Sequence, residues 1–504
     1  METQKPFVDT SYRLTFQTNT TKLIKESTND IHTNLACIMR KIRNHSKNKN
    51  MSLAQLKTVS NETANFPKLA YKKDKLFNKL INKQEKVAVV GLGYVGLPLA
   101  VHMASKFKVV GFDINESKIM QIIQHKDPCK ELSEEEFKGK DISYTSNDEI
   151  LKEAKFYIVA VPSPIDDMKK PNLTPIKAAT ATIAKYLKKG DCVVFESTVY
   201  PGCTEEICVP ILERISRLKF NEDFTVGYSP ERINPGDKKY TFTKIKKIVS
   251  GSTEEALDLI ADVYSTVVTA GVHKAPSLKV AEAAKVVENI QRDVNIGLMN
   301  ELSQIFNVLD VNTKDVLEAA GTKWNFHNYF PGLVGGHCIG VDPYYLITRA
   351  KQKKYTPKLL EQVREINEGM MGHIALQLER RLYAKRFRKH RVSVLVKGIA
   401  FKENVNDMRN SKTAELCVDL MNRGYEVVVQ DYMVDAEEVK EHYGITINNT
   451  PEGEFDAIIL AVDHDDYKHL SYYDHMKNGN KETVIFDVKG DKKDKFPCGV
   501  YMSL

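Results

Sequence analysis

Short apolar runs alternate with segments of helical spacing over residues 85–504, and this alternation is the main structural signal in the chain. Within the segments between the runs, apolar positions recur about every three to four residues, as on one face of an amphipathic helix. Apolar strands that alternate with helices are typical of a parallel sheet covered on both faces. The first group of predicted strands is Val87–Val90, Val109–Phe112, Phe156–Val161, Cys192–Glu196 and Phe224–Tyr228.

A long segment of helical character separates this first group of runs from a second group. It extends from about Ser277 to Leu309, is rich in Ala and Glu, and contains no proline. We therefore predict an α/β protein with two Rossmann-like doubly wound domains, residues 84–275 and 376–504, joined by a central helical region, residues 276–375. The predicted strands of the second domain are Val392–Val396, Val427–Gln430, Ala457–Val462 and Val484–Val488.

Residues 1–83 differ from the rest of the chain in charge and in pattern. They contain no glycine, show weak hydrophobic periodicity and carry 16 Lys/Arg against 6 Asp/Glu, whereas the whole chain carries a net charge of +7. The basic excess therefore belongs to this segment, which we predict to be a flexible N-terminal extension. A tether to an anionic partner and an organelle-targeting segment are the alternatives. Nucleic-acid binding is not favoured, because the extension has few aromatic residues and no known module.

Composition excludes several other classes of protein. Hydrophobic residues make up 42% and charged residues 28% of the 504 positions, as in ordinary globular proteins. The eight cysteines form no C-x-x-C pair, which favours reduced thiols in the cytoplasm. The uncharged stretch Val87–Ser105 contains three glycines and a proline, and we interpret it as part of a nucleotide-binding motif rather than as a membrane span.

The first predicted strand leads directly into a G-x-G-x-x-G motif made by Gly91, Gly93 and Gly96. In such motifs the first glycine permits a tight turn, the second lets a pyrophosphate approach the backbone, and the third allows close packing of helix on sheet. Asp113 follows the next strand, twenty residues beyond Gly93, where a carboxylate binds ribose hydroxyls and repels a 2′-phosphate. The motif therefore predicts NAD as cofactor, against the alternative of a glycine-rich turn in an unrelated sheet.

A second motif, FPGLVGGHCIGVDPYY, occupies residues 330–345 and contains Cys338 among glycines. A thiol can attack an aldehyde, and Asp342 four residues later can handle a proton or a water molecule. A single cysteine is also often only a small buried hydrophobe. His337 suggests zinc, but two ligands without partners at metal spacing do not predict a metal site.

These motifs and several others together resemble the UDP-glucose/GDP-mannose dehydrogenase family, over everything from about Lys86 onward. The nearest branch in pattern is that of the UDP-N-acetylhexosamine 6-dehydrogenases. The segments that carry the resemblance are residues 87–113, VAVPSP at 159–164, ESTVYPG at 196–202, GYSPERINPGD at 227–237, AEAAKVVEN at 281–289, residues 335–345 and FKENVNDMRNS at 401–411.

The resemblance implies a four-electron oxidation of the C6 hydroxyl of a UDP-N-acetylhexosamine to the uronate, for polysaccharide or glycan precursor synthesis, through a thiohemiacetal and a thioester on the cysteine. It also implies roles in oxyanion stabilisation and in positioning water for residues outside the two motifs. The catalytic residues implied are Cys338, Lys285, Asn289, Asp342, Glu231 and Thr198.

The same resemblance implies that residues on both sides of a cleft contact the two ligands. For Lys285 and Asn289 a solvated helix face is the alternative, and for Lys402 and Arg409 it is a basic surface loop. The implied cofactor contacts are Gly91, Gly93, Tyr94, Val95, Gly96, Asp113, Lys118, Ser163, Thr198 and Arg409. The implied contacts to the UDP-sugar are Glu231, Arg232, Lys285, Asn289, Gly335 and Lys402, with the sugar nucleotide bound largely by the C-terminal domain.

Three alternatives to this function remain open at the level of sequence. A UDP-glucose 6-dehydrogenase is the first, although Pro235 stands where that branch typically carries a second glutamate. A two-electron hydroxyacid dehydrogenase would have no need of Cys338, and a non-catalytic nucleotide-sugar-binding protein would lack it or Lys285. The resemblance also implies a homodimer or a higher homo-oligomer, with dimerisation through the central helix. The apolar residues Val286, Val287, Ile290 and Leu298 of this helix also suit an intradomain core.

Overall fold

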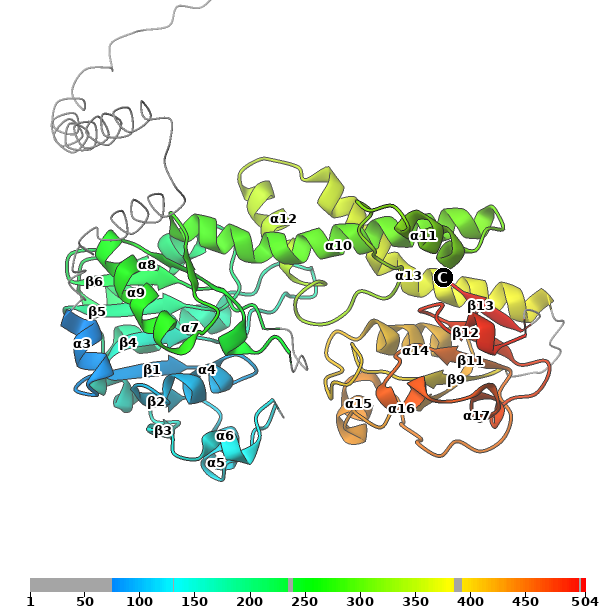
Figure 1. Ribbon diagram of the computed structural model, residues 1–504, viewed down its shortest axis with the longest axis horizontal. Coiled ribbons are helices and arrows are strands. Elements are labelled where there is room, and N and C mark those ends of the chain that lie inside the picture. Colours follow the sequence, from blue (N-terminus) through cyan, green and yellow to red (C-terminus); the bar gives the residue numbers. More distant parts are fainter. Residues whose placement is uncertain (1–74, 130, 234–238, 385–391, 498–499) are drawn as a thin grey trace, which may run out of the picture. The chain divides into compact units, whose positions relative to one another are not determined.

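A computed structural model describes residues 75–129, 131–233, 239–384, 392–497 and 500–504. In this part of the chain, two β-sheets are connected through long helices, as Figure 1 shows. The predicted fold class, two Rossmann-like α/β domains with a central helical region, is thereby confirmed. None of the helices in these ranges combines the length and the hydropathy that a membrane-spanning segment needs.

The first sheet has eight strands in the order β3-β2-β1-β4-β5-β6-β7-β8, and only β7 runs antiparallel to its neighbour β6. The five predicted strands are present, and β3, β7 and β8 are additional. The bounds are β1 Lys86–Val90, β2 Lys108–Phe112, β3 Ile142–Thr145, β4 Ala154–Val159, β5 Asp191–Phe195, β6 Phe224–Tyr228, β7 Lys247–Gly251 and β8 Val272–Lys274.

Helices cover both faces of this sheet, which explains why its central strands β1, β4, β5 and β6 are predominantly apolar. Ala88 and Val90 of β1 belong to one hydrophobic core, and Val87 and Val89 belong to the core on the opposite face. The first core includes residues of α7 and α8, and the second those of α3, α4, α5 and α9. The bounds are α3 Lys75–Ile81, α4 Gly96–Met103, α5 Glu116–Ile123, α6 Glu134–Phe137, α7 Thr174–Ala184, α8 Val209–Ser216 and α9 Glu254–Val267.

Helix α3 corrects the predicted boundary of the N-terminal extension. Phe77 and Leu80 of this helix are buried in the second core, although we assigned residues 1–83 to a flexible extension. Burying these two side chains removes their apolar surface from water, so residues 75–83 belong to the folded domain. The remainder of the predicted extension lies outside the described residues.

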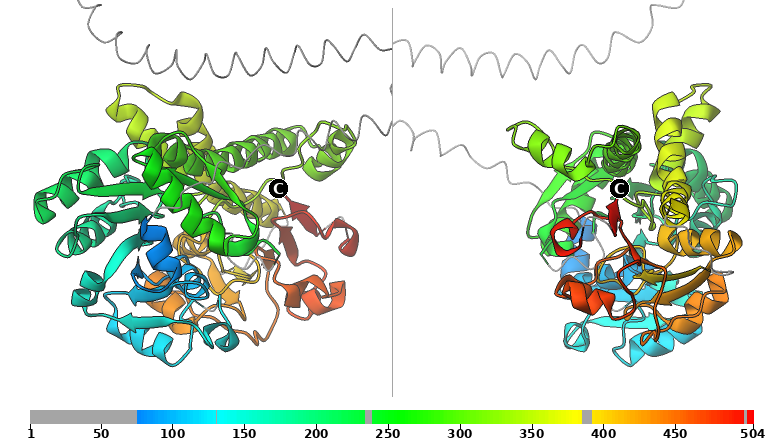
Figure 2. Two further views of the ribbon diagram at one scale, coloured as in Figure 1. Left: turned by 60° about the vertical axis from the view of Figure 1, so that its left-hand side comes forward. Right: turned by 90° about the vertical axis from the view of Figure 1, so that its right-hand side faces the viewer.

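Two long helices form the central region. Helix α10, predicted over 277–309, extends from Leu278 to Val308 and packs against β6, β7 and α13, and Figure 2 shows α10 in green and α13 in yellow. Helix α13 also packs against α14 and β12 of the second domain, so our boundary at residue 375 falls inside α13. The remaining central helices and α13 have the bounds α11 Thr313–Gly321, α12 Asp342–Gln352 and α13 Lys358–Ala384.

The second sheet is entirely parallel, in the order β10-β9-β11-β12-β13. Val394 and Val396 of β9 face one core and Leu395 faces the other, so this sheet too is covered on both faces. The bounds are β9 Ser393–Lys397, β10 Glu426–Gln430, β11 Ala457–Leu460, β12 Val484–Asp487, β13 Tyr501–Ser503, α14 Lys412–Asn422, α15 Ala436–Tyr443, α16 Asp465–Lys468 and α17 Tyr472–Met476.

Candidate active site

The loop between β1 and α4 has the shape that its three glycines predict. Gly91 has a φ of +94°, and a Cβ there would lie 2.6 Å from the carbonyl oxygen of Ala160. A Cβ at Gly96 would lie 1.7 Å from the carbonyl oxygen of Gly91, whereas a Cβ at Gly93 would meet no atom within 4 Å. The outer glycines are therefore required by packing, and the middle one faces open space in which a ligand can approach the backbone.

Tyr94 and Val95 lead from this open position into helix α4. Val95 precedes the first helical residue and offers no side-chain hydrogen bond to the helix, so no side chain caps the start of α4. The N–H of Leu97 donates to the carbonyl of Gly93 at 3.1 Å, which leaves the N–H groups beside it to meet an anion. This arrangement suits the pyrophosphate of a dinucleotide.

Asp113, at the end of β2, accepts three hydrogen bonds, one of which comes from the same loop. Its Oδ2 accepts from the backbone N–H of Leu92 at 2.9 Å and from Lys118 Nζ at 3.0 Å, and its Oδ1 accepts from the N–H of Asn115 at 3.0 Å. Lys118, one of the predicted cofactor contacts, thus lies beside the carboxylate that we expect to bind the ribose.

The turn that carries Cys338 packs closely against the loop after β9. Gly336 has a φ of +82° and donates its N–H to the carbonyl of Asn410 at 3.1 Å, and a Cβ there would lie 2.7 Å from the ring of Phe401. A Cβ at Gly335 would lie 2.7 Å from the carbonyl oxygen of Asn410. The two glycines are therefore needed for the close approach of the cysteine turn to the C-terminal domain.

Lys285, Asn289 and Asp342 form a buried cluster in which two side chains of α10 meet the first residue of α12. Lys285 Nζ lies 3.8 Å from Asp342 Oδ2, and Asn289 donates its amide N–H to the same oxygen. Burial raises the pKa of Asp342, although Lys285 opposes this effect. All three side chains are at least nine-tenths buried, so the alternative of a solvated helix face is excluded for Lys285 and Asn289.

Cys338 lies within the electrostatic influence of this cluster. Burial raises the pKa of its thiol above the usual value, while the charges of Lys285, Arg292 and Lys402 act in the opposite direction. Arg292 is a residue that the sequence reasoning missed, and it donates to Asn289 Oδ1 from one helical turn further along α10. Its spacing of three residues from Asn289 is the signal that points to it.

Glu231 takes part in a second buried cluster. Its Oε1 accepts from the backbone N–H groups of Arg232 and Ile233 at 2.5 Å each, and its Oε2 accepts from Lys247 Nζ at 2.9 Å. Burial alone would raise the pKa of Glu231, but Lys247 and these donors lower it below the usual value. Glu231 is therefore held as a carboxylate at neutral pH.

Glu196 and Lys247 complete this cluster, and neither was predicted as a site residue. Lys247 Nζ donates to Glu196 Oε2 at 2.6 Å, and the Tyr264 hydroxyl donates to Glu196 Oε1. Burial raises the pKa of Glu196 to about 7, with Lys247 opposing and Glu231 adding to the effect. Two carboxyl groups that share one lysine thus have pKa values on opposite sides of their usual range.

Thr198 and Ser163 lie in the loops that follow β5 and β4. The neighbouring Ser197 hydroxyl accepts from the N–H of Val161 at 3.0 Å and donates to its carbonyl at 2.8 Å, which ties the two loops together. Tyr345 of α12 donates its hydroxyl to the carbonyl of Pro164 at 3.1 Å. These bonds connect the loops that contain Thr198 and Ser163 to the helix that begins at Asp342.

Arg409 of the C-terminal domain lies over the dinucleotide loop. Its guanidinium is 5.4 Å from the centre of the Tyr94 ring and donates twice to Asp407, at 3.0 and 2.8 Å. Burial acts to raise the pKa of Asp407, but hydrogen bonds from His337 and Arg409 lower it well below the usual value. Asp407 therefore binds both His337 and Arg409, and Arg409 in turn contacts Tyr94, although residues 94, 337 and 409 are far apart in the sequence.

Arg232 is bound in a way that the sequence did not predict. Its Nε and Nη2 contact Glu288 of α10 at 3.2 and 2.8 Å, and its Nη1 donates to the carbonyl of Lys246 at 2.6 Å. In the structure these contacts connect the loop after β6 to α10. Among the described residues, no group of three or more His, Cys, Asp or Glu side chains is arranged to hold a metal ion.

Three family models match consecutive parts of the chain. They are the NAD binding domain of the UDP-glucose/GDP-mannose dehydrogenase family at residues 85–268, its central domain at 279–369 and its UDP binding domain at 395–491. The glycine loop and Asp113 lie in the first, Lys285, Asn289 and Cys338 in the second, and Lys402 and Arg409 in the third.

Individual proteins give the same result. The UDP-N-acetyl-D-glucosamine 6-dehydrogenase of Pseudomonas aeruginosa is 50% identical over 81% of this chain and 97% of its own length. The enzyme of the same name from Salmonella typhi is 48% identical over 80% of this chain and 96% of its own length. A solved UDP-D-ManNAc dehydrogenase from Pyrococcus horikoshii covers 83% of this chain and 98% of its own, with a TM-score of 0.74 and 30% identity.

Proposed function

Because the chain belongs to the UDP-glucose/GDP-mannose dehydrogenase family, we propose that it oxidises C6 of UDP-N-acetylglucosamine to a carboxylate with two molecules of NAD. The sugar is inferred from the two relatives named for it, which are 50% and 48% identical to this chain. The observation that supports the chemistry is that Asp342, which lies 3.8 Å from Lys285 Nζ, donates its backbone N–H to the carbonyl of Cys338 at 2.9 Å, so the lysine and the cysteine are held beside one residue.

NAD, when bound, accepts hydride, and a primary alcohol must lose two hydrides to become a carboxylate. The open backbone at Gly93, the uncapped start of α4 and the fixed carboxylate of Asp113 are the features that fit NAD. Arg409, which lies over Tyr94, extends this binding surface from the other side.

Cys338 is assigned the covalent step. After the first oxidation its Sγ loses the thiol proton and forms a C–S bond with the aldehyde carbon, and the carbonyl oxygen, stabilised by Lys285, takes up a proton as the C=O double bond becomes a single bond. The second oxidation removes that proton and the hydrogen on carbon and leaves a thioester. Water then attacks the acyl carbon, the C–S bond breaks, and the carboxylate and the thiol are released.

The two buried clusters provide the groups that this sequence of steps needs. Lys285 and Asn289 both contact Asp342, so an oxyanion near Cys338 meets two donors fixed by one carboxylate. Glu231 is ionised and is coupled through Lys247 to Glu196, whose pKa of about 7 lets it accept and return a proton near neutral pH. We assign Glu231, Thr198 and Asp342 to the positioning and deprotonation of the hydrolytic water.

The test is NADH formation with UDP-N-acetylglucosamine, UDP-N-acetylgalactosamine, UDP-N-acetylmannosamine and UDP-glucose. We expect two NADH per UDP-N-acetylglucosamine and loss of the uronate product in Cys338→Ala. One NADH per sugar, or unchanged product in the variant, would contradict the thioester route. A higher kcat/KM for another sugar would keep the reaction and replace the substrate.

We also propose that the protein is a cytoplasmic homodimer. Val280, Val287, Leu298 and Ile305 of α10 are between 45% and 52% exposed, and their spacing places them on one helical face. Val286 and Ile290, in contrast, are buried in the first core. Sedimentation of the wild type against Val287→Glu/Leu298→Glu tests the dimer, since a charged face should give monomers and an unaffected dimer would exclude this interface.

A further inference from the structure

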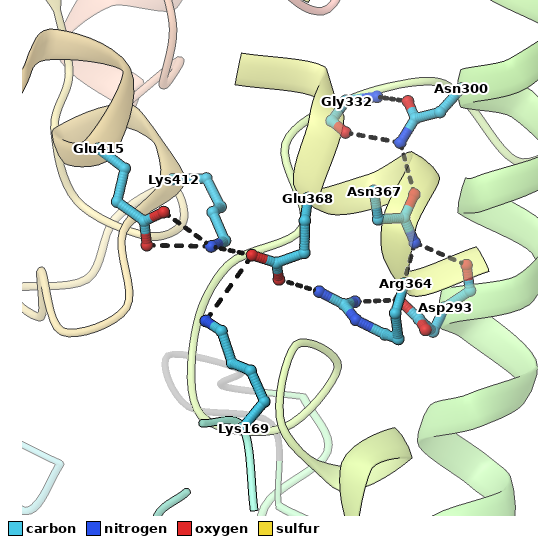
Figure 3. Close-up of polar contacts among 9 residues, drawn as sticks. All are labelled: Lys169, Asp293, Asn300, Gly332, Arg364, Asn367, Glu368, Lys412 and Glu415. Atoms are coloured by element: carbon cyan, nitrogen blue, oxygen red, sulfur yellow. Dashed lines mark hydrogen bonds and ion pairs between the residues drawn. The ribbon is translucent and has the colours of Figure 1, made fainter. Parts of the chain in front are cut away.

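Glu368 of α13 lies at the meeting point of three cationic side chains, as Figure 3 shows. Its Oε2 is 2.7 Å from Lys412 Nζ and 3.8 Å from Lys169 Nζ, and its Oε1 accepts from Arg364. Lys412 and Arg364 are almost completely buried, whereas Lys169 is 46% exposed. The Glu368 carboxylate therefore forms ion pairs with two buried cations and with one exposed cation.

The three cations come from three different regions of the chain. Lys169 lies in the loop after β4 that contains Ser163, and Arg364 lies on α13 in the central region. Lys412 is the first residue of α14 and directly follows the loop that contains Arg409. Glu368 is thus a contact shared by the NAD binding domain, the central helices and the UDP binding domain.

A chain of hydrogen bonds continues from this point toward α10, the helix that carries Lys285 and Asn289. Arg364 donates to Asp293 Oδ1 at 2.5 Å, and Asn367 donates to the same oxygen at 2.8 Å. Asn300 donates to Asn367 at 2.7 Å and to the carbonyl of Gly332 at 3.1 Å. Asp293 follows Asn289 by one helical turn on α10, and Gly332 precedes the cysteine turn, so the network reaches both sides of the candidate active site.

Removal of the Glu368 charge would leave each buried cation with another acid. Lys412 Nζ also lies 3.0 and 2.9 Å from the two oxygens of Glu415, and Arg364 keeps Asp293. Burial acts to raise the pKa of Glu368, but Lys412 and Arg364 lower it below the usual value, so the group is ionised at neutral pH. A neutral glutamine at this position therefore removes the shared contact without leaving an isolated buried charge.

We propose that Glu368 is a positioning residue for NAD binding. By holding Lys412 to the central helix, it fixes the start of α14 and with it the preceding loop, in which Arg409 lies over Tyr94. By holding Lys169, it fixes the loop of the NAD binding domain on the opposite side. This inference deepens the proposed function and rests on its NAD site, but not on the choice of sugar.

The experiment compares Glu368→Gln with Glu365→Gln in the full-length protein, with NAD affinity measured by calorimetry in the absence of sugar. Glu365 lies on the same helix and accepts a hydrogen bond from Gln362 at 2.7 Å, so its substitution is a matched charge removal outside the network. We expect the Kd for NAD to rise about tenfold in Glu368→Gln and to stay within about twofold in Glu365→Gln. The unfolding midpoint of Glu368→Gln should stay near that of Glu365→Gln.

Lys169→Ala is the second variant, because this exposed side chain can be shortened without disturbing the core. It should raise the Kd for NAD about threefold, since it removes one of the two interdomain contacts. An unchanged Kd in both Glu368→Gln and Lys169→Ala would overturn the proposal, as would an equal rise in Glu365→Gln. If the wild type itself failed to bind NAD, the proposed function and this inference would both be wrong, whereas unaffected variants would exclude only the inference.

Discussion

Asp342 connects the polar side chains around Cys338, because its Oδ2 forms an ion pair with Lys285 and accepts a hydrogen bond from Asn289. The burial that fixes this geometry also raises the pKa of the Cys338 thiol. Cys338 is therefore held as a thiol at rest, and the opposing charges of Lys285 and Asp342 influence how readily it becomes a thiolate.

Alkylation of Cys338 by iodoacetamide, followed on its peptide by mass spectrometry, should report this balance. Lys285→Met removes a charge that lowers the thiol pKa, so we expect alkylation at pH 8 to slow about tenfold. Asp342→Asn removes a charge that raises the pKa and should accelerate the reaction. Equal rates in both variants would show that neither charge controls the thiol.

Glu196 offers a pH test at the same scale. Its pKa is raised from 4.5 to about 7, so the folded protein binds this proton more tightly than the unfolded chain does. The corresponding stability is complete below about pH 4.5 and is lost as the pH rises through about 7, a loss of about 3 kcal/mol. Urea unfolding at pH 5 and pH 8 should show this decrease in the wild type and a smaller one in Glu196→Gln. The same pH dependence in both proteins would contradict the assignment.

At the scale of elements, different glycines of the loop between β1 and α4 meet two different requirements, close packing of the backbone and access for a ligand. Gly96 is glycine because the backbone of Gly91 occupies the place of a Cβ, whereas the space beside Gly93 is open. Packing and ligand binding can therefore be altered independently in this loop.

Gly96→Ala should mainly lower the stability of the protein, whereas Gly93→Ala should mainly lower its affinity for NAD. Gly96→Ala forces the backbone apart, and we expect the free energy of unfolding to fall by more than about 2 kcal/mol. Gly93→Ala should keep its stability within about 0.5 kcal/mol and yet lose NAD affinity at least tenfold. Chemical denaturation and calorimetry with NAD measure the two effects, and similar stability losses in both variants would refute the distinction.

Most elements were predictable because their burial leaves a pattern in the sequence. Strands β1, β2, β4, β5 and β6 are apolar on both faces, and α10 matched its expected span closely. Strand β8 has only three residues, two of them exposed, and β3 alternates weakly, so neither carries such a pattern. The contact of Arg409 with Tyr94 depends on how the domains pack, which no local pattern encodes.

At the scale of the whole molecule, the site residues span positions 91 to 409, and the folded unit that carries them begins with α3. Phe77 and Leu80 of α3 pack in the core that includes Val87 and Val89 of β1. The N-terminal limit of a functional fragment is therefore set by these two side chains rather than by the change in charge near residue 83.

Two truncations test this limit. A chain that starts at Lys75 keeps both side chains and should retain the kcat and the unfolding midpoint of the full-length protein. A chain that starts at Gln84 loses them, and we expect its free energy of unfolding to fall by about 4 kcal/mol. Equal stability of the two fragments would show that α3 contributes nothing to the fold, and a loss of turnover in the longer one would assign a role to residues 1–74.

The antiparallel direction of β7 within the first sheet determines where Lys247 lies relative to Glu231. Tyr228 pairs with Ser250 and Gly227 with Gly251, so each step forward from β6 toward Glu231 is a step backward along β7 toward Lys247. If β7 were parallel to β6, its first residue would lie at the other end of the strand, about 13 Å away over four residues. Because β7 is antiparallel to β6, the N-terminal residue of β7, Lys247, provides the cation shared by Glu196 and Glu231.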